Sequence, residues 1–230
     1  MPNALRIAVR TIGELLITAG LLIGLFLVWQ LWWTDVVANR EQAQEVQALT
    51  AAFERAEVPD DALDPDSLVE NAPPSGDAFA VIHIPRFGAD YARPILEDTG
   101  PDTLALGVGH YVGTAMPGEV GNFAVAGHRT TYGAPFNRIA ELQPGDVIVI
   151  ETRSAYHSYR VDHHRIVRPW QTEVLEPAPS EPGVEPTERW LTMTSCHPMW
   201  SARERYILHS TLVESVPRNR TTLSEMLRTA

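Results

Sequence analysis

The one cysteine of the chain stands where a reactive side chain could be displayed. Cys196 ends an apolar run that begins at Trp190, and His197-Pro198 follows it. A proline at this distance stops a strand, so the sulfur is expected at a strand end beside a loop, where catalytic groups are commonly found. A thiol in this place can act as a nucleophile. The alternative is a buried cysteine that packs as a small hydrophobic residue.

A cysteine nucleophile needs a partner that moves protons, and eight histidines are available. His128 is the favoured candidate because it follows the small-residue strand 123–127 and opens the polar loop 129–133. The small residues allow close approach of the backbone, and the loop leaves the imidazole accessible. His197 is the second candidate, but it adjoins Cys196, and neighbours on a strand point to opposite faces.

An oxyanion that forms on the substrate needs hydrogen-bond donors, and two arginines follow the cysteine. Arg203 and Arg205 begin the next predicted strand, and a hairpin would return them beside Cys196. A guanidinium carries a fixed charge and several donors, which suits it to this task. Alternation places both arginines on the same side, so spacing does not choose between them. Either could instead form a surface ion pair with Glu204 or another acid.

Composition excludes several other kinds of chemistry. All 18 basic residues are arginine, which excludes a Schiff-base lysine, a P-loop lysine and a catalytic lysine dyad. A single cysteine excludes an intramolecular disulfide and any multi-cysteine metal site, and we expect neither a metal nor a cofactor. The net charge of -11 argues against nucleic acid as a partner.

The candidate residues Cys196, His128, Arg203 and Arg205 lie in or beside short apolar stretches bounded by glycine and proline. Helical pattern is limited to 101–106 and 136–142, and the segment 174–187, rich in proline and glutamate, is expected to be a long surface loop. Many strands with few helices indicate an all-β barrel or sandwich. The predicted strands are 78–84, 122–126, 146–151, 156–167, 189–195 and 205–213.

Leu15 to Trp33 is a run of 19 residues without a charge. At about 1.5 Å per residue, a helix of this length crosses the hydrocarbon core of a bilayer. Arg6 and Arg10 precede the run, and positive flanks stay cytoplasmic, so the sequence predicts a single-pass signal-anchor with the rest of the chain outside the cell. A cleaved signal peptide is the alternative, but its apolar region is shorter and ends in small residues.

The chain therefore divides into four predicted parts. Within the second part, 39–56 is typical of a solvated helix, and 58–77 is too rich in acids and prolines to bury a core. Residues 41–70 hold nine acids and one base, so most of the net charge belongs to this part. The parts are a cytoplasmic tip and membrane helix (1–33), an acidic extracellular spacer (34–76), a catalytic domain (77–218) and a C-terminal tail (219–230).

Three motifs, in this order along the chain, resemble those of sortases. Ala126-Gly127-His128 resembles the sortase histidine motif, and the run 191–196 resembles the signature T-L-x-T-C. The strand that starts Arg205-Tyr206-Ile207-Leu208 resembles the arginine strand of the family, and this alignment selects Arg205 over Arg203.

Longer strings, 109–118 and 126–136, are most similar to class E sortases of actinobacteria, and the resemblance covers roughly 78–216. The departures from the signature are Met193 for leucine and Ser195 for threonine. They bear on substrate preference more than on catalysis.

The resemblance implies an eight-stranded β-barrel with short helices, preceded by one transmembrane helix and exposed outside the cell membrane. It implies a cysteine transpeptidase that cleaves a C-terminal sorting signal between threonine and glycine. That signal is L-P-x-T-G or, for class E, more often L-A-x-T-G. The implied partners are surface proteins that carry this signal, and an amine of a lipid-linked cell-wall precursor.

The resemblance also implies roles for individual residues. Cys196 would attack the threonine carbonyl, His128 would supply a proton to the departing glycine amine, and Arg205 would hold the substrate and stabilise the oxyanion. Tyr111 corresponds to a tyrosine that class E enzymes are thought to use to read the second position of the signal. We expect Tyr111 and Ser195 to contact the substrate.

Two other functions remain open. A pilin-polymerising sortase would use a lysine of another pilin as nucleophile, and such enzymes often carry a lid with an Asp-Pro-aromatic motif. Here Asp66 follows Asp64-Pro65 in place of an aromatic residue. The other function is that of a non-catalytic, membrane-tethered β-barrel with a buried cysteine.

Overall fold

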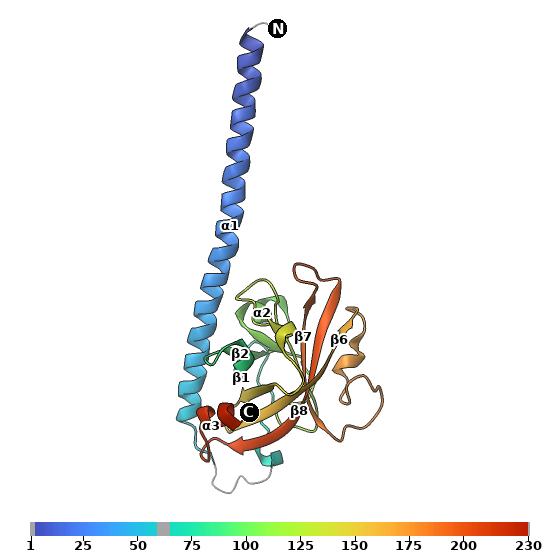
Figure 1. Ribbon diagram of the computed structural model, residues 1–230. Coiled ribbons are helices and arrows are strands. Elements are labelled where there is room, and N and C mark those ends of the chain that lie inside the picture. Colours follow the sequence, from blue (N-terminus) through green and yellow to red (C-terminus); the bar gives the residue numbers. More distant parts are fainter. Residues whose placement is uncertain (1–2, 59–64, 230) are drawn as a thin grey trace.

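The computed structural model describes residues 3–58 and 65–229, which form a closed β-barrel with one long helix at its side (Figure 1). The strands are hydrogen-bonded in the order β1-β2-β3-β4-β7-β8-β6-β5, and the eight-stranded barrel is confirmed. Their bounds are β1 (Ala78–His83), β2 (Ala92–Glu97), β3 (Val108–His110), β4 (Gly121–Ala126), β5 (Val147–Glu151), β6 (Ala155–Val167), β7 (Arg189–His197) and β8 (Glu204–Pro217).

Alternation along the strands separates an inner face from an outer one. Phe123 and Val125 of β4 and Leu191 and Met193 of β7 belong to the large buried cluster inside the barrel. The residues between them face the outer wall. Because β4 and β7 run parallel with Ala126 paired to Thr194, both strands end at the same rim of the barrel.

The two strands that the sequence analysis missed are β2 and β3. β2 contains Arg93-Pro94, and a proline within a run argues against a strand. β3 has three residues, too few to show an alternating pattern. The predicted helix 101–106 is present as α2 (Pro101–Leu106), whereas 136–142 contains one 3-10 turn, Ile139–Glu141. Residues 172–175 form another 3-10 turn, at the start of the predicted long loop.

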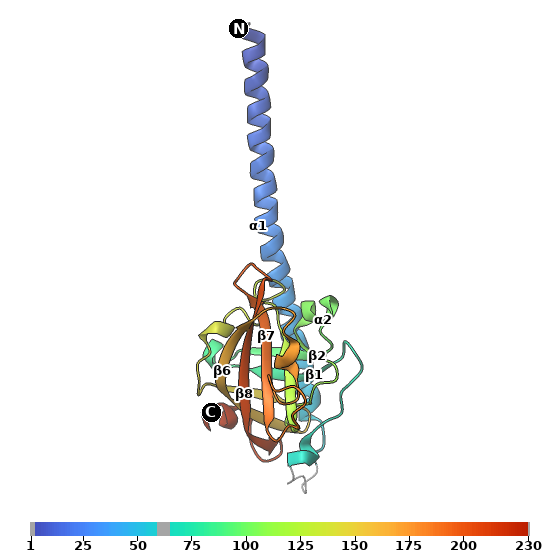
Figure 2. The same cartoon turned by 90° about the vertical axis from the view of Figure 1, so that its right-hand side faces the viewer.

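The long helix α1 (Asn3–Glu54) has two different halves. In the part of the chain that the structure describes, it is the one helix long and apolar enough to cross a membrane. Its N-terminal half extends beyond the barrel, and its C-terminal half lies along β1 and β2 (Figures 1 and 2). There Leu49 and Phe53 pack against Val81 of β1.

The region predicted to be a spacer is therefore not fully solvated. Residues 39–54 are helical, as the composition indicated, but one face of this helix is buried on the barrel because Leu49 and Phe53 supply apolar anchors. Leu68 is buried too, and Ser154 Oγ donates to its carbonyl oxygen. The acidic and proline-rich residues 59–64 lie outside the described part of the chain.

The C-terminal segment also packs on the barrel. α3 (Leu223–Thr229) places Met226 against Val147 and Val149 of β5 and Tyr156 of β6. The predicted tail therefore contributes apolar contacts to the domain rather than lying free of it.

Candidate active site

Cys196 and Arg205 lie directly opposite each other on β7 and β8. Opposed residues of antiparallel strands carry their side chains on the same face, with Cβ atoms about 4.5–5.5 Å apart. Both side chains are partly exposed. Arg203 lies in the connection before β8, so the register, which the sequence could not supply, separates the two arginines.

His128 follows β4 at the rim where β7 ends. Gly127 N donates to the carbonyl oxygen of Thr194 (3.1 Å), which continues the parallel pairing of β4 and β7 up to the histidine. His128 lies two residues past Ala126, the last paired residue of β4, and Cys196 lies two residues past Thr194, the partner of Ala126 on β7. Strand pairing thus brings the position of His128 to the same rim of the barrel as Cys196 and Arg205.

Close packing explains the small residues before His128. A Cβ on Gly127 would stand 2.6 Å from the ring of Phe136, which is fully buried. Phe136 N also donates to the carbonyl oxygen of His128 (3.0 Å), and Asn137 Nδ2 donates to that of Arg129 (2.8 Å). These bonds close the loop that carries the histidine.

The polar face of α1 holds the far side of this loop. Gln42, which is buried, donates from Nε2 to the carbonyl oxygen of Tyr132 (2.9 Å), and Asp35 Oδ1 accepts from the Gly133 amide (3.1 Å). Gly133 has a φ of +72°, a conformation that favours glycine. The centre of the Tyr132 ring lies 5.1 Å from that of the His128 ring. The helix therefore contacts Tyr132, which in turn contacts His128.

Burial lowers the pKa of His128 below its ordinary value, because the partly desolvated imidazole is less able to carry a charge. The neutral ring is therefore favoured in the free protein, and a proton placed on it is given up more readily. His110, by contrast, is fully buried inside the barrel, where its Nδ1 is 2.6 Å from Glu97 Oε2.

Arg129 links the histidine loop to the cysteine strand, and the sequence analysis assigned it no role. It is 7% exposed, and its Nη1 donates both to the carbonyl oxygen of Cys196 (3.2 Å) and to Nδ1 of His197 (3.1 Å). Its guanidinium also lies 5.5 Å from the centre of the Tyr206 ring. His197 is thus engaged by Arg129, on the opposite face of β7 from Cys196.

Tyr111 lies beside the same outer wall. Its hydroxyl is 3.0 Å from Thr194 Oγ1, and Thr194 shares a face with Cys196. A cavity of about 200 Å³ opens there, between Tyr111, Thr194 and Arg205 on one side and the segment 167–175 on the other. The start of the predicted long loop therefore forms one wall of a cavity that Arg205 borders.

Ser195 occupies a different position from the one expected of a substrate contact. It is 3% exposed, and its Oγ donates to the carbonyl oxygen of Gly127 (2.8 Å). This bond ties the cysteine strand to the residue before His128. No group of three histidine, cysteine or acidic side chains suited to a metal ion occurs within 3–58 and 65–229.

Three contributors to the site had weak signals in the sequence. Arg129 directly follows His128, but nothing in the pattern indicates that its side chain turns inward. Gln42 and Asp35 lie about 90 residues before the loop they hold. A polar stripe on the helix was the one available signal, and it is also typical of a solvated face.

Comparison with known proteins identifies the family of this fold. The family model described as Sortase domain matches residues 82–213. Sortase SrtE1 of Streptomyces coelicolor is 36% identical over 95% of the chain, which spans 61% of the length of that relative. Sortase SrtE2 of the same organism is 33% identical over 95% of the chain and 88% of its own length. Among solved structures, sortase E from Streptomyces avermitilis is 39% identical with a TM-score of 0.61, covering 67% of this chain and 99% of that one.

Proposed function

Because the chain belongs to the sortase family, we propose that it is a membrane-anchored cysteine transpeptidase of the class E type. It would cleave a C-terminal LAxTG- or LPxTG-type sorting signal between threonine and glycine and transfer the acyl group to a cell-wall amine. One observation carries the proposal: Arg205 is the register partner of Cys196, and His128 follows β4, which is paired to the cysteine strand up to Ala126 and Thr194.

The reaction follows from the chemistry of these side chains. The Cys196 sulfur attacks the threonine carbonyl carbon, and the oxyanion that develops accepts hydrogen bonds from the guanidinium of Arg205. His128 holds the proton that the thiol gives up and passes it to the glycine nitrogen as the carbon–nitrogen bond breaks. Its lowered pKa makes the protonated ring a stronger acid, which suits this transfer.

An amine then completes the transfer. Its nitrogen attacks the thioester carbonyl, His128 takes the proton that this nitrogen loses, and the sulfur leaves with the electron pair of the carbon–sulfur bond. The amine of a lipid-linked cell-wall precursor is the proposed acceptor, and surface proteins that carry the sorting signal are the proposed donors.

Tyr111 is the proposed substrate contact at the second signal position, because it borders the cavity that Arg205 also lines. For Ser195 we propose a positioning role in place of a direct contact, since its hydroxyl is buried on Gly127. Residues 15–33 of α1 are the proposed membrane span, with the barrel outside the cell, and Trp29 stacks on Trp33 near its outer end (6.1 Å).

A fluorogenic peptide that contains LAxTG tests the proposal on the full chain. Cys196→Ala and His128→Ala should abolish cleavage, and Arg205→Ala should lower kcat/KM by about 100-fold or more, the effect of removing an oxyanion donor. Arg203→Ala is the matched control and should keep most of the activity. Turnover by Cys196→Ala, or a larger loss in Arg203→Ala than in Arg205→Ala, would refute the assignment.

A further inference from the structure

The connection between β7 and β8, residues 198–203, exposes large apolar side chains beside the reactive cysteine. Trp200 is 74% exposed and Met199 is 42% exposed. Exposing the apolar surface of a tryptophan to water is unfavourable, and on this loop the side chain contributes nothing to the core of its own chain. The position of Trp200 relative to α1 indicates which partner contacts this side chain.

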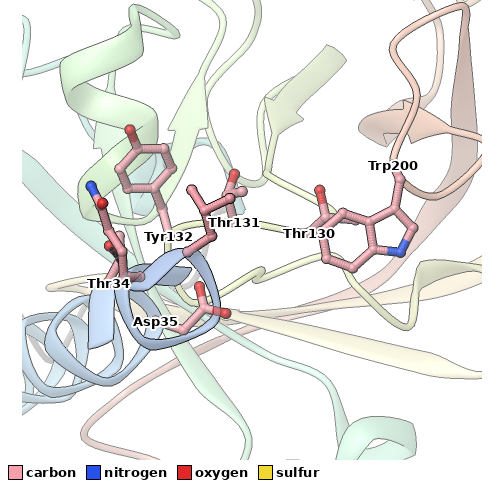
Figure 3. A pocket seen from close by; sticks show the side chains of 8 residues that line it. Thr34, Asp35, Thr130, Thr131, Tyr132 and Trp200 are labelled. Carbon is pink, nitrogen blue, oxygen red and sulfur yellow. Dashed lines mark hydrogen bonds between the residues drawn. The ribbon is translucent and has the colours of Figure 1, made fainter. Parts of the chain in front are cut away.

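Trp200 lies level with the apolar half of α1. A cavity of about 320 Å³ is lined by Trp200, by Leu27, Gln30, Thr34 and Asp35 of α1, and by residues 130–132 of the histidine loop. Figure 3 shows Trp200 on one side of this cavity and Thr34 and Asp35 on the other. Leu27 and Gln30 belong to the run 15–33 that we propose to span the membrane.

The β7–β8 connection also reaches further along α1, toward its N-terminus, than any other part of the barrel (Figures 1 and 2). If the hydrocarbon core ends at Trp33, the headgroup layer adds about 5–8 Å. At about 1.5 Å per residue that layer spans roughly the next four or five residues of the helix. The cavity that Trp200 shares with Leu27, Gln30, Thr34 and Asp35 straddles this limit, so the connection lies at the boundary between acyl chains and headgroups.

From this placement we propose that residues 198–203 are a second membrane contact. Met199 and Trp200 enter the boundary between headgroups and acyl chains of the bilayer that α1 spans, and the exposed Arg203 reaches the lipid phosphates. Tryptophan favours this boundary because its ring is amphipathic, and arginine extends its charge toward the headgroups. The proposal rests on the proposed anchor.

The consequence concerns access to the active site. Cys196 lies two residues before this connection, so its edge of the barrel opens at the membrane surface. An acceptor amine carried by a lipid of the same leaflet would then meet the acyl-enzyme without leaving the bilayer. A soluble ligand fits the 320 Å³ cavity poorly, because Leu27 and Gln30 of the proposed span form part of its wall.

Fluorescence quenching in nanodiscs tests the depth of the connection. In a full-length Cys196→Ala background, which removes the native thiol, Trp200→Cys, Trp33→Cys and Val213→Cys are each labelled with the environment-sensitive fluorophore NBD. Lipids with a doxyl quencher near the headgroup should quench the labels at positions 33 and 200. Val213, also exposed, lies nine residues further along β8 and about 30 Å from its start, and its label should stay unquenched.

Each outcome decides the proposal. Quenching at position 33 without quenching at 200 would overturn the second contact and leave the anchor intact. Absence of quenching at both positions would overturn the anchor as well. Protection of the label at 200 that depends on the protein-to-lipid ratio, without quenching, would assign the loop to a second copy of the chain.

A transfer assay gives an independent readout. The acceptors are triglycine in solution and triglycine linked to phosphatidylethanolamine in vesicles. Trp200→Ser should lower transfer to the lipid-linked acceptor by about 10-fold, as expected for roughly 1.4 kcal/mol of lost interfacial binding, and leave transfer to the soluble one unchanged. Trp200→Tyr, which keeps an amphipathic ring, should restore it. An equal loss with both acceptors would contradict the proposal.

Discussion

The cysteine and the histidine of the site are held in different ways. Cys196 lies on a strand that is paired to β4 up to Thr194 and to β8 up to His197, so strand pairing fixes its position. His128 lies past the end of β4, on a loop fixed by Phe136, by Asn137 and by the polar face of α1. The position of the proposed nucleophile therefore depends on the sheet, and the position of its proposed proton partner depends on contacts with α1.

This difference predicts that changes to the loop will reduce activity and leave the cysteine strand intact. The largest effect is expected for Gly127→Ala, whose Cβ would overlap the Phe136 ring. Overpacking of this kind costs about 1–3 kcal/mol, and a displaced imidazole should lower kcat/KM by about 100-fold. Peptide cleavage measures the loss, and mass spectrometry after iodoacetamide treatment should still show one alkylated cysteine.

The double variant Gly127→Ala, Phe136→Leu is the control, because a smaller side chain at 136 relieves the overlap and should recover part of the activity. Wild-type turnover by Gly127→Ala alone would show that the loop does not need this close contact.

Arg129→Ala tests the link between the two regions. It removes the buried guanidinium that donates to the Cys196 carbonyl oxygen and to His197. Hydrogen bonds from a charged donor contribute about 1.5–3 kcal/mol, so kcat should fall by about 10- to 100-fold. His197→Ala removes one of these acceptors and should cost much less. Equal losses in the two variants would mean that Arg129 acts through His197 alone.

Gln42→Ala tests the contribution of α1. The variant removes the bond to the Tyr132 carbonyl oxygen, which is worth about 1 kcal/mol, so kcat should fall by about 5-fold. Gln47→Ala, an exposed glutamine on the same helix, is the matched control and should behave as the wild type. A kcat unchanged by Gln42→Ala would indicate that the sheet alone positions the histidine.

The smallest effect is a pKa change at His128. Burial holds this pKa below the ordinary value of 6.5, so the ring stays neutral until the pH falls below that value. Tyr132→Ala exposes the ring to water, and the pKa should rise toward 6.5, whereas Tyr132→Phe keeps the aromatic cover and should leave it low. NMR titration of the imidazole carbon signals measures the change. A pKa that Tyr132→Ala leaves in place would assign the burial to other groups.

Most of the barrel could be predicted because its long strands carry alternating or apolar patterns bounded by glycine and proline. β2 and β3 could not, since one contains a proline and the other has three residues. The docking of residues 39–54 on the barrel could not be predicted either. A docked helix differs from a solvated one only by a few apolar residues, here Leu49 and Phe53, which pack against Val81 of β1.

The sequence by itself determined which residue types are available for the proposed chemistry: one cysteine after an apolar run and a histidine after small residues. It also contains an apolar run long enough to cross a membrane. These are local properties of residue type and spacing. The family resemblance selected Arg205 over Arg203, and the strand register places Arg205 opposite Cys196. The tertiary structure alone decided that the Arg129 side chain is buried and that Asp35 and Gln42 hold the histidine loop. Strand register and helix docking join residues tens of positions apart, and no local pattern encodes such contacts.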